Sequence, residues 1–317
     1  MELRQFRYFV GVSEAGSLLK ASGKLHVAQP ALGQQIAALE DEVGAKLFER
    51  SSKGMALTEA GKLFLAHAKV VLMDVERARL AVRETLSVPQ GEVSIGLPTT
   101  VALAATLPIL IACRERLPGV RLKLVEAYSG FLREWLLAGR LDIALLYGEA
   151  SDPGLSKRAL LDDRLVLVTS VGSTRIPKKL RLQALPDWPL VLPGVEHGLR
   201  TIIDEACAPL GLALNVVAEI ESLGSVKRAV EAGIGATILP AVSVAEEVAQ
   251  GRLRTIVIDS PSMSRRVVRA TSVMRPATGA AVAVSALVQE VVRDMTHSGA
   301  WPARWLDKGD EQTRAPL

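Results

Sequence analysis

The chain has 317 residues, of which 49% are hydrophobic and 23% are charged, and its formal net charge is +4. This composition is typical of a globular protein of about two domains and excludes a disordered chain. It contains no apolar run long enough for a membrane span and no N-terminal apolar block, which predicts a cytoplasmic protein. Cys113 and Cys207 lie too far apart in sequence for a metal knuckle, so we expect buried free thiols.

The first sixty residues predict three short helices. Apolar residues at helical spacing begin at Leu3, and Ser17 is a good N-cap residue for a second helix. A short turn, 26–28, precedes Gln29-Pro30, and proline is well placed in the first turn of a helix. Gly44 ends this third helix. Two helices joined by so short a turn predict a helix-turn-helix.

Residues 47–57 predict a hairpin or wing, because apolar ends flank a polar tip that contains serine and glycine. Thr58 then caps a helix that runs to about Ser87. The apolar residues of this helix form a stripe at nearly heptad spacing, which favours pairing with a second helix. The stripe consists of Phe64, Ala68, Val71, Val75, Ala78, Val82 and Leu86. The alternative is packing on its own domain. We favour pairing because about thirty helical residues make a rod about 45 Å long.

From Glu92 onward, apolar strands alternate with helices, which predicts a mostly parallel sheet with helices on both faces. The strands are expected at 93–97, 120–126, 141–146, 164–170, 190–192, 216–220, 236–239, 253–258 and 267–273. The helices are expected at about 101–117, 131–138, 199–210, 225–232 and 280–295. Residues 298–317 are polar, with several glycines and prolines, and predict a mobile tail that unusually contains Trp301 and Trp305.

One motif runs in register through most of the first sixty residues. Its positions are Gly16-Ser17-Leu18, Ala21, Leu25-His26-Val27-Ala28-Gln29-Pro30-Ala31-Leu32, Gln35-Ile36, Leu39-Glu40, Gly44, Leu47-Phe48, Arg50, Gly54, Leu57-Thr58 and Ala60-Gly61. This motif resembles the N-terminal domain of LysR-type transcriptional regulators. The family usually has serine where this chain has Ala28 and Gly33.

Further stretches resemble the same family. The sequence from Val230 to Ala236, followed by Leu239-Pro240, is similar to the signature of its effector domain. Four stretches resemble the nitrogen assimilation control proteins within the family: 91–97, 136–142, 146–148 and 260–264. The resemblance implies control of nitrogen or small-metabolite utilisation genes.

The resemblance implies an α/β fold class with three parts. These are a winged helix-turn-helix at 1–58, a linker and dimerisation helix at 59–90 and an effector-binding domain at 91–297. The effector domain would resemble periplasmic binding proteins, with subdomain I at about 91–163 and 266–297 and subdomain II at about 164–265. The expected partners are double-stranded DNA, further copies of the chain in a homodimer or homotetramer, a small-molecule co-effector and, as a further candidate, RNA polymerase.

The start of the third helix carries the candidate base contacts. The amide of Gln29 can pair with an adenine through one donor and one acceptor, and Pro30 and Ala31 can touch a thymine methyl group. In the family this helix start carries base contacts, and the resemblance implies the same here. The alternative for Gln29 is a solvated first-turn side chain. The candidate DNA-contacting residues are Ser17, Gln29, Pro30, Ala31, Gln34, Gln35, Arg50 and Lys53.

Net charge does not identify this domain as a DNA-binding one. Among the first sixty residues, seven basic side chains balance seven acidic ones. The placement of the charges is what indicates DNA. Acidic residues such as Glu40 fall late in the third helix, whereas Arg50 and Lys53 lie at the wing, where they suit contacts with phosphates.

Strand ends and helix starts in the α/β region supply candidate ligand contacts. Thr99 and Thr100 open a helix whose N–H groups and hydroxyls suit an anion, with plain helix capping as the alternative. For His197 the alternative is a loop or cap residue. Family ligands contact equivalent positions, so the candidates are Thr99, Thr100, Ser129, Tyr147, His197, Gly198 and Leu199.

Two other function classes compete with a transcriptional regulator. An enzyme is one, but the four histidines are scattered without the spacing of a catalytic triad, so we expect no catalytic residue, no metal ion and no cofactor. A solute-binding protein is the other, and the helix-turn-helix argues against it. We therefore expect a sequence-specific regulator that responds to a small anionic co-effector or acts without one.

Overall fold

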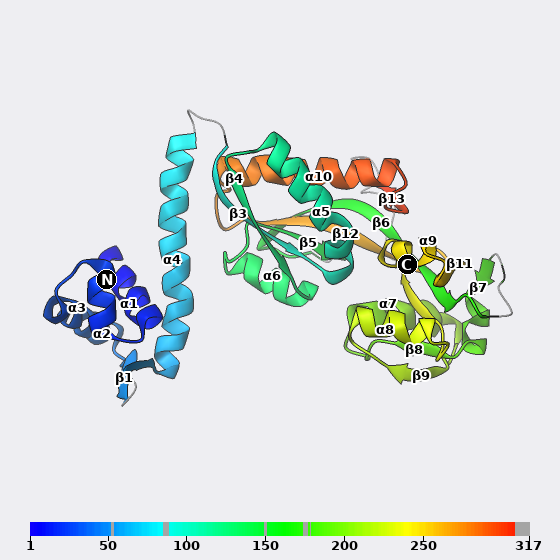
Figure 1. Cartoon of the computed structure of the whole chain (residues 1–317), viewed down its shortest axis with the longest axis horizontal. Coiled ribbons are helices and arrows are strands. Elements are labelled where there is room, and N and C mark those ends of the chain that lie inside the picture. The colour runs from blue at the N-terminus through cyan, green and yellow to red at the C-terminus, as the bar shows by residue number, and fades with distance from the viewer. Residues whose placement is uncertain (52–53, 85–88, 149–150, 174–176, 178, 308–317) are drawn as a thin grey trace. The chain divides into compact units, whose positions relative to one another are not determined.

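The structure is a computed structural model that describes the chain except residues 52–53, 85–88, 149–150, 174–176, 178 and 308–317. It contains two compact units, Met1–Val88 and Pro89–Leu317, which we call the N-terminal and C-terminal units (Figure 1). Within the described residues, no helix combines the length and the apolar character that crossing a membrane requires. Cys113 and Cys207 are buried free thiols, as predicted.

Three helices form the core of the N-terminal unit. They are α1 (Leu3–Ala15), α2 (Leu18–Leu25) and α3 (Gln29–Val43). Residues 26–28 join α2 to α3, which confirms the predicted helix-turn-helix. The chain reverses within this short turn because His26 adopts a left-handed backbone with φ of +53°. Phe9, Leu32 and Leu39 are fully buried and form the centre of this small core.

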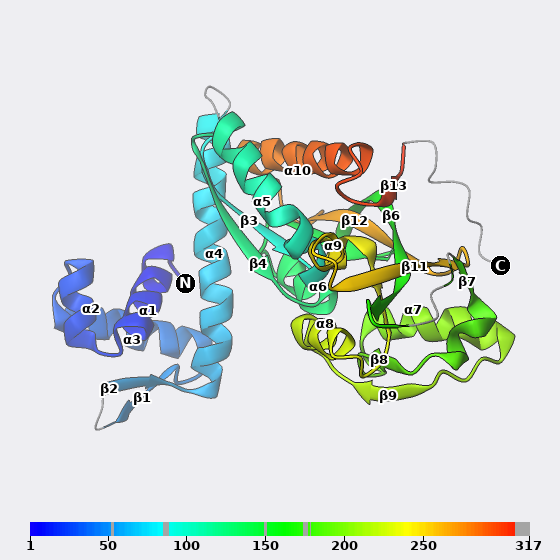
Figure 2. The same ribbon diagram turned by 45° about the vertical axis from the view of Figure 1, so that its right-hand side comes forward.

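A two-stranded hairpin, β1 (Phe48–Ser51) and β2 (Gly54–Leu57), forms the predicted wing (Figure 2). The N–H of Met55 donates to the carbonyl oxygen of Gly16 at 2.9 Å, so the hairpin docks against the connection between α1 and α2. Gly54 has φ of +123°, and a Cβ at this position would collide with that same carbonyl oxygen. Glycine is therefore required here on two grounds, conformation and space.

Glu40 ties α3 to the wing. Its carboxylate is only 8% exposed and accepts hydrogen bonds from the backbone N–H groups of Leu47 (2.9 Å) and Phe48 (3.1 Å) and from Nζ of Lys46 (2.7 Å). Burial alone would raise the pKa of Glu40, but these hydrogen bonds outweigh it and hold the pKa below its usual value. The charged carboxylate is thus the form that the fold stabilises.

The long helix α4 (Glu59–Glu84) begins after Thr58, whose Oγ1 accepts a hydrogen bond from a backbone N–H of the first turn at 2.9 Å. Its first half packs on its own unit, where Ala68 is fully buried. Farther along the helix, Val71 and Ala78 of the predicted apolar stripe are exposed. Packing on its own unit therefore accounts for the first turns of α4 and leaves these later apolar side chains uncovered within the N-terminal unit.

The C-terminal unit is built on a mixed sheet of nine strands, counted over the described residues, with the order β4-β3-β5-β12-β6-β11-β7 and with β10 and β13 also paired to β6. Its strands are β3 (Gly91–Leu97), β4 (Val120–Glu126), β5 (Ile143–Tyr147), β6 (Leu155–Ser170), β7 (Lys179–Arg181), β10 (Thr237–Pro240), β11 (Leu253–Asp259), β12 (Ser264–Ser272) and β13 (Ala303–Trp305). A smaller sheet pairs β8 (Leu190–Leu192) with β9 (Val216–Glu219). The α-helices are α5 (Thr99–Arg116), α6 (Ser129–Leu137), α7 (Gly198–Cys207), α8 (Leu223–Glu231), α9 (Ala245–Ala249) and α10 (Gly279–His297).

The long strand β6 runs between two hydrophobic clusters. Its residues 155–164 pair with β12, whereas residues 165–170 pair with β10 and β11. One cluster involves the first part of β6 together with β3, β5, α5 and α10, and the other involves the second part together with α7 and α8 (Figure 2). The middle of β6 therefore lies where the two halves of the unit meet.

The sheet is mixed, and the expectation of a mostly parallel sheet is wrong. β3, β4 and β5 are parallel to one another, but β12 is antiparallel to both β5 and β6. Periodicity reports which residues are buried and says nothing about strand direction. β6 also starts earlier than predicted, at Leu155, because its first part alternates polar and apolar residues only loosely.

The prediction of a mobile tail over 298–317 is wrong for its first part. Trp301 is fully buried, and β13 pairs with residues 161–163 of β6. The indole of Trp301 supplies the apolar area that holds a segment of otherwise polar composition in place. Residues 308–317 lie outside the described residues.

We expect Glu40→Gln to destabilise the N-terminal unit by about 1.5–3 kcal/mol at neutral pH, because a neutral amide accepts these hydrogen bonds more weakly. Since the pKa of Glu40 is lowered in the folded chain, its stabilisation is present above the unfolded-state pKa and is lost as the pH falls through the folded-state pKa. Urea unfolding of both proteins from about pH 7 to about pH 3 should show their difference shrinking. Asp41→Asn, at an exposed carboxylate on the same helix, is the control. If the difference in unfolding free energy between the wild type and Glu40→Gln does not change with pH, the charged form of Glu40 does not stabilise the unit.

Candidate nucleic-acid interface and strand-end site

The exposed face of α3 carries most of the predicted base contacts. The exposed residues are Gln29, Pro30, Ala31 and Gln34, and Gln35 is half-buried. On the opposite face, Leu32, Ile36 and Leu39 are buried in the core of the unit. The helix therefore packs on the core through one face, and its exposed first turns are accessible to a major groove.

The remaining predicted DNA contacts come from outside α3. Ser17 occupies the N-cap position of α2, but its side chain makes no capping hydrogen bond, so the hydroxyl is left for another acceptor such as a phosphate. Arg50 lies on β1 opposite Met55, and its side chain is outside the described part of the structure. Lys53 lies outside the described residues altogether.

In the C-terminal unit, three predicted residues at strand ends are connected by hydrogen bonds: Thr100, Ser129 and Tyr147. We call them, together with Arg265, the strand-end group. Thr100 lies in the first turn of α5, directly after β3, and its Oγ1 lies 2.6 Å from the hydroxyl of Tyr147 at the end of β5. The Oγ of Ser129, the first residue of α6, accepts a hydrogen bond from the backbone N–H of Tyr147 at 3.4 Å. Three segments distant in sequence thus converge because parallel strands place their carboxyl ends at one edge of the sheet.

Arg265 is the central cation of this group, and it is not among the residues predicted from the sequence. Its Nη2 donates to Oγ1 of Thr100 (2.5 Å) and to Oδ2 of Asp163 (3.0 Å), and its guanidinium lies 3.9 Å from the centre of the Tyr147 ring. The other carboxylate oxygen of Asp163 accepts a hydrogen bond from Nε1 of Trp301 at 3.1 Å. Arg265 and Asp163 are both buried, so each neutralises a charge that would otherwise be costly in the interior.

These contacts determine the protonation state of Tyr147. Burial raises the pKa of Tyr147, while the nearby charge of Arg265 and the hydrogen bond with Thr100 oppose this rise. The phenol is therefore protonated at neutral pH and presents an O–H donor. The hydroxyls of the group and the N-terminus of the 18-residue helix α5 favour an anion, while the charge of Arg265 is balanced by Asp163.

His197 is the N-cap residue of α7, where its Nδ1 accepts a hydrogen bond from the N–H of Leu199 at 3.1 Å. Its ring meets Tyr128 edge-on at 5.5 Å between centroids, so it lies near the strand-end group. Burial lowers the pKa of His197, with a contribution from Arg265 and an opposing one from Glu221, so the ring is neutral at neutral pH.

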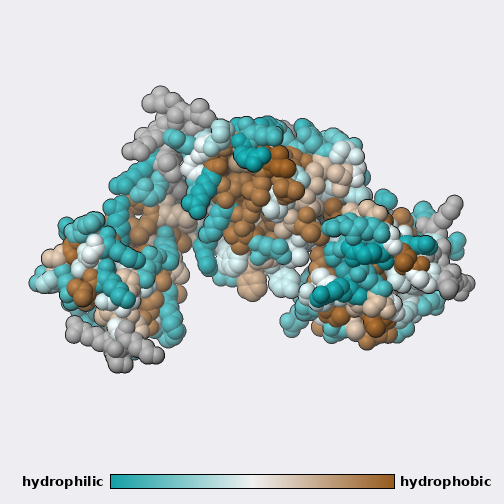
Figure 3. All heavy atoms as spheres, in the orientation of Figure 1, coloured by the Kyte–Doolittle hydropathy of each residue, from teal (hydrophilic) through white to brown (hydrophobic). Residues whose placement is uncertain are grey.

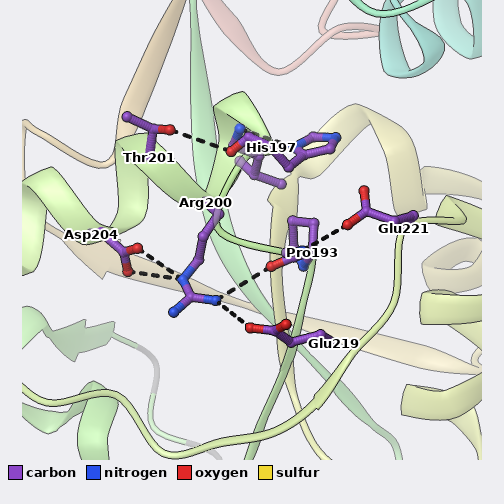
Figure 4. A network of polar contacts seen from close by, with 9 residues as sticks. Pro193, His197, Arg200, Thr201, Asp204, Glu219 and Glu221 are labelled. Atoms are coloured by element: carbon purple, nitrogen blue, oxygen red, sulfur yellow. Dashed lines mark hydrogen bonds and ion pairs between the residues drawn. The ribbon is translucent and has the colours of Figure 1, made fainter.

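The start of α7 is held by a polar network behind His197 (Figure 4). Arg200 donates to Oδ1 of Asp204 (3.0 Å), to Oε1 of Glu219 (3.1 Å) and to the carbonyl oxygen of Pro193 (3.4 Å). This network fixes the position of the exposed Gly198 and of the cap residue, because it joins the first turn of α7 to the end of β9.

The structure thus gathers some of the predicted ligand residues and separates others. Thr100, Tyr147 and Ser129 are connected by hydrogen bonds, and Thr99 opens the same helix as Thr100. Leu199 is buried beneath the start of α7. A signal for the missed residues was present in the sequence: Asp162-Asp163 and Arg265-Arg266 interrupt two apolar strands, and charges in such a strand require a partner.

Two further features bear on function. Among the described residues, no group of three or more histidine, cysteine or acidic side chains is arranged to hold a metal ion.

An apolar groove of about 380 Å³ lies along α5 and β4, lined by residues that include Leu107, Ile111 and Val120. Figure 3 shows the apolar patch over α5. Leu103, Leu107, Leu110 and Ile111 are exposed large hydrophobic residues of this helix.

Comparisons with known proteins match both units. Residues 3–62 match the family described as "Bacterial regulatory helix-turn-helix protein, lysR family", and residues 87–293 match "LysR substrate binding domain". The nitrogen assimilation regulatory protein nac of Klebsiella aerogenes is 40% identical over 242 residues, which are 76% of this chain and 78% of that protein. The protein of the same name from Escherichia coli (strain K12) is 37% identical over 242 residues, with the same two coverages.

A solved structure, full-length CbnR complexed with its target DNA, shares the fold. It covers 93% of this chain and 99% of its own, with a TM-score of 0.67 and 24% sequence identity.

We expect Trp301→Phe to destabilise the C-terminal unit by about 1.5–3 kcal/mol, because the ring still packs while one oxygen of the buried Asp163 loses its donor. Trp305→Phe, at a half-buried indole on the same segment, is the matched control and should destabilise the unit clearly less than Trp301→Phe does, because this ring is only partly buried. Denaturant unfolding measures both. Equal losses in the two variants would show that ring packing alone, and not the indole N–H, stabilises this segment.

Proposed function

We propose that this chain, which belongs to the LysR family of bacterial transcriptional regulators, controls nitrogen-related genes as a homo-oligomer that reads DNA with α3. Family membership rests on matches that together span residues 3–62 and 87–293. Within the proposal, the observation that carries DNA reading is the exposed first part of α3, where Gln29 and Gln34 present amides on a helix whose other face is buried.

The nitrogen-related role rests on the relatives. The two nac proteins, at 40% and 37% identity, are named as nitrogen assimilation regulators, and they are similar to this chain over 242 residues in each case. We propose that this chain controls genes of the same class. It has no catalytic role in this proposal and acts in the cytoplasm, where its DNA would be.

The strand-end group is the proposed co-effector site, with Thr99, Thr100, Tyr147 and His197 as contacts. A small anion fits it best, because the group combines the N-terminus of α5, whose first N–H groups have no partner within the helix, with the hydroxyls of Thr100 and Tyr147. Arg265 already donates a hydrogen bond to the hydroxyl of Thr100, which is also hydrogen-bonded to Tyr147. These polar groups therefore have partners within the chain when no co-effector is bound. Regulation without a co-effector is the second candidate, and these internal hydrogen bonds are the observation that favours it.

Two surfaces support self-assembly. The exposed Val71 and Ala78 continue the apolar stripe of α4 beyond its own core, and helices with such a stripe pair readily. The exposed leucines of α5 beside the groove form a second apolar patch on the C-terminal unit. A chain with two separate self-complementary surfaces can form a dimer through one and a tetramer through both.

We expect Gln29→Ala to weaken operator binding by about 1–3 kcal/mol and to relax base preference at a single position, because one bidentate amide contact is lost. Fluorescence anisotropy at fixed salt, with DNA from upstream of the chain's own gene and its single-base variants, measures this. Gln250→Ala removes a surface amide from the C-terminal unit and serves as the control. If Gln29→Ala binds every variant site as the wild type does, this residue does not read a base.

Genome-wide mapping of binding sites, with and without nitrogen limitation, tests the proposed gene class. We expect occupied sites to gather upstream of genes for nitrogen uptake and use, and occupancy to change with nitrogen supply. Sites confined to unrelated genes, with occupancy indifferent to nitrogen, would overturn the nitrogen assignment and leave DNA binding intact.

A further inference from the structure

Two arginines face each other across neighbouring strands of the C-terminal unit. Arg269 on β12 is paired in register with Arg158 on β6, and its other neighbour in the sheet, on β5, is the apolar Leu145. Side chains paired in this way on antiparallel strands share one face of the sheet, with Cβ atoms about 5 Å apart. Nη1 of Arg269 donates to Oγ of Ser285 on α10 at 2.8 Å, so this face is the one that α10 covers.

This pair lacks the acidic partner that its neighbours have. Earlier on β12, Arg265 is paired with Asp163 and Arg266 with Asp162. Among the described residues, Arg158 has no hydrogen bond or ion pair, and the buried Nε of Arg269 has no hydrogen-bond partner. Like charges directly opposite each other destabilise a sheet, and a buried donor without an acceptor adds to that cost.

The pKa of Arg269 also indicates that this pair of arginines lacks an acidic partner. Its pKa is lowered, first by burial and second by the charge of Arg158, and no acidic group contributes in the opposite direction. Ser285 is buried, and its oxygen accepts from Arg269, which leaves its own proton to donate. The structure therefore places two partly buried cations opposite each other on neighbouring strands, with a hydroxyl donor bonded to one of them, and a negative charge beside them would be favourable.

We propose that Arg158, Arg269 and Ser285 form a binding site for a small oxyanion, a carboxylate or a phosphate, on the α10 face of the sheet. An oxyanion accepts from two guanidinium groups at once, removes their repulsion and satisfies the buried Nε. The site is separate from the strand-end group, because Arg269 lies four residues beyond Arg265 on β12, roughly 13 Å along the strand. With a second anion site in the same unit, the chain can respond to a second small ligand besides the proposed co-effector.

The test uses the full chain and two probes, inorganic phosphate and acetate, each against chloride at the same ionic strength. Thermal unfolding is followed as probe concentration rises, because a ligand that binds the folded state raises the Tm in a concentration-dependent way. We expect the wild type to be stabilised by at least one probe, and Arg269→Gln and Arg158→Gln each to bind that probe at least tenfold more weakly. Response to acetate alone assigns a carboxylate, and response to phosphate alone assigns a phosphate.

Two further variants separate this site from others that bind anions. Arg254→Gln removes an exposed arginine from β11 and should leave the response unchanged. Thr100→Val alters the strand-end group and should leave the part of the response that depends on Arg269 intact. The proposal is overturned if neither probe stabilises the wild type, or if both arginine variants respond as the wild type does. The proposal would also be overturned if an acidic side chain of a second copy pairs with these arginines. The Tm would then depend on protein concentration, Arg269→Gln would abolish that dependence, and neither probe would have an effect.

Discussion

The carboxylate of Asp163 lies fully buried in the middle of β6, and each of its oxygens accepts a hydrogen bond from a different part of the chain. Arg265 comes from β12, and Trp301 comes from the segment that precedes β13. A buried carboxylate is stable only when it is paired and hydrogen-bonded, so these segments must be in place together. The strand-end group follows from this arrangement, because Asp163 positions Arg265 against Thr100 and Tyr147.

The N-terminal unit uses the same principle on a smaller scale. Glu40 is buried near the end of α3 and accepts hydrogen bonds from two backbone N–H groups of the wing and from Lys46. The placement of the wing relative to α3 thus depends on an acidic side chain, although the unit is proposed to bind a polyanion. This explains why the formal charge of the first sixty residues is uninformative: some of the acids, such as Glu40, are structural and already neutralised by donors.

Local patterns were enough to predict much of this structure. Ser17, Gln29-Pro30 and Gly44 mark helix boundaries by their own conformational preferences, so α2 and α3 could be placed from the sequence. Pairings between distant segments could not be predicted that way. The direction of β12, the burial of Trp301 and the contact of Arg265 with Thr100 each join residues more than a hundred positions apart, and no local periodicity encodes them.

A hydroxyl-radical footprint tests whether the first turns of α3 read DNA as part of a symmetric assembly. The purified chain would be bound to DNA from upstream of its own gene at physiological salt. We expect protected half-sites related by two-fold symmetry and separated by about one helical turn, roughly 10.5 base pairs, or a multiple of it. Diffuse protection that spreads along the DNA and disappears with modest added salt would contradict the claim, because that pattern is typical of non-specific phosphate binding.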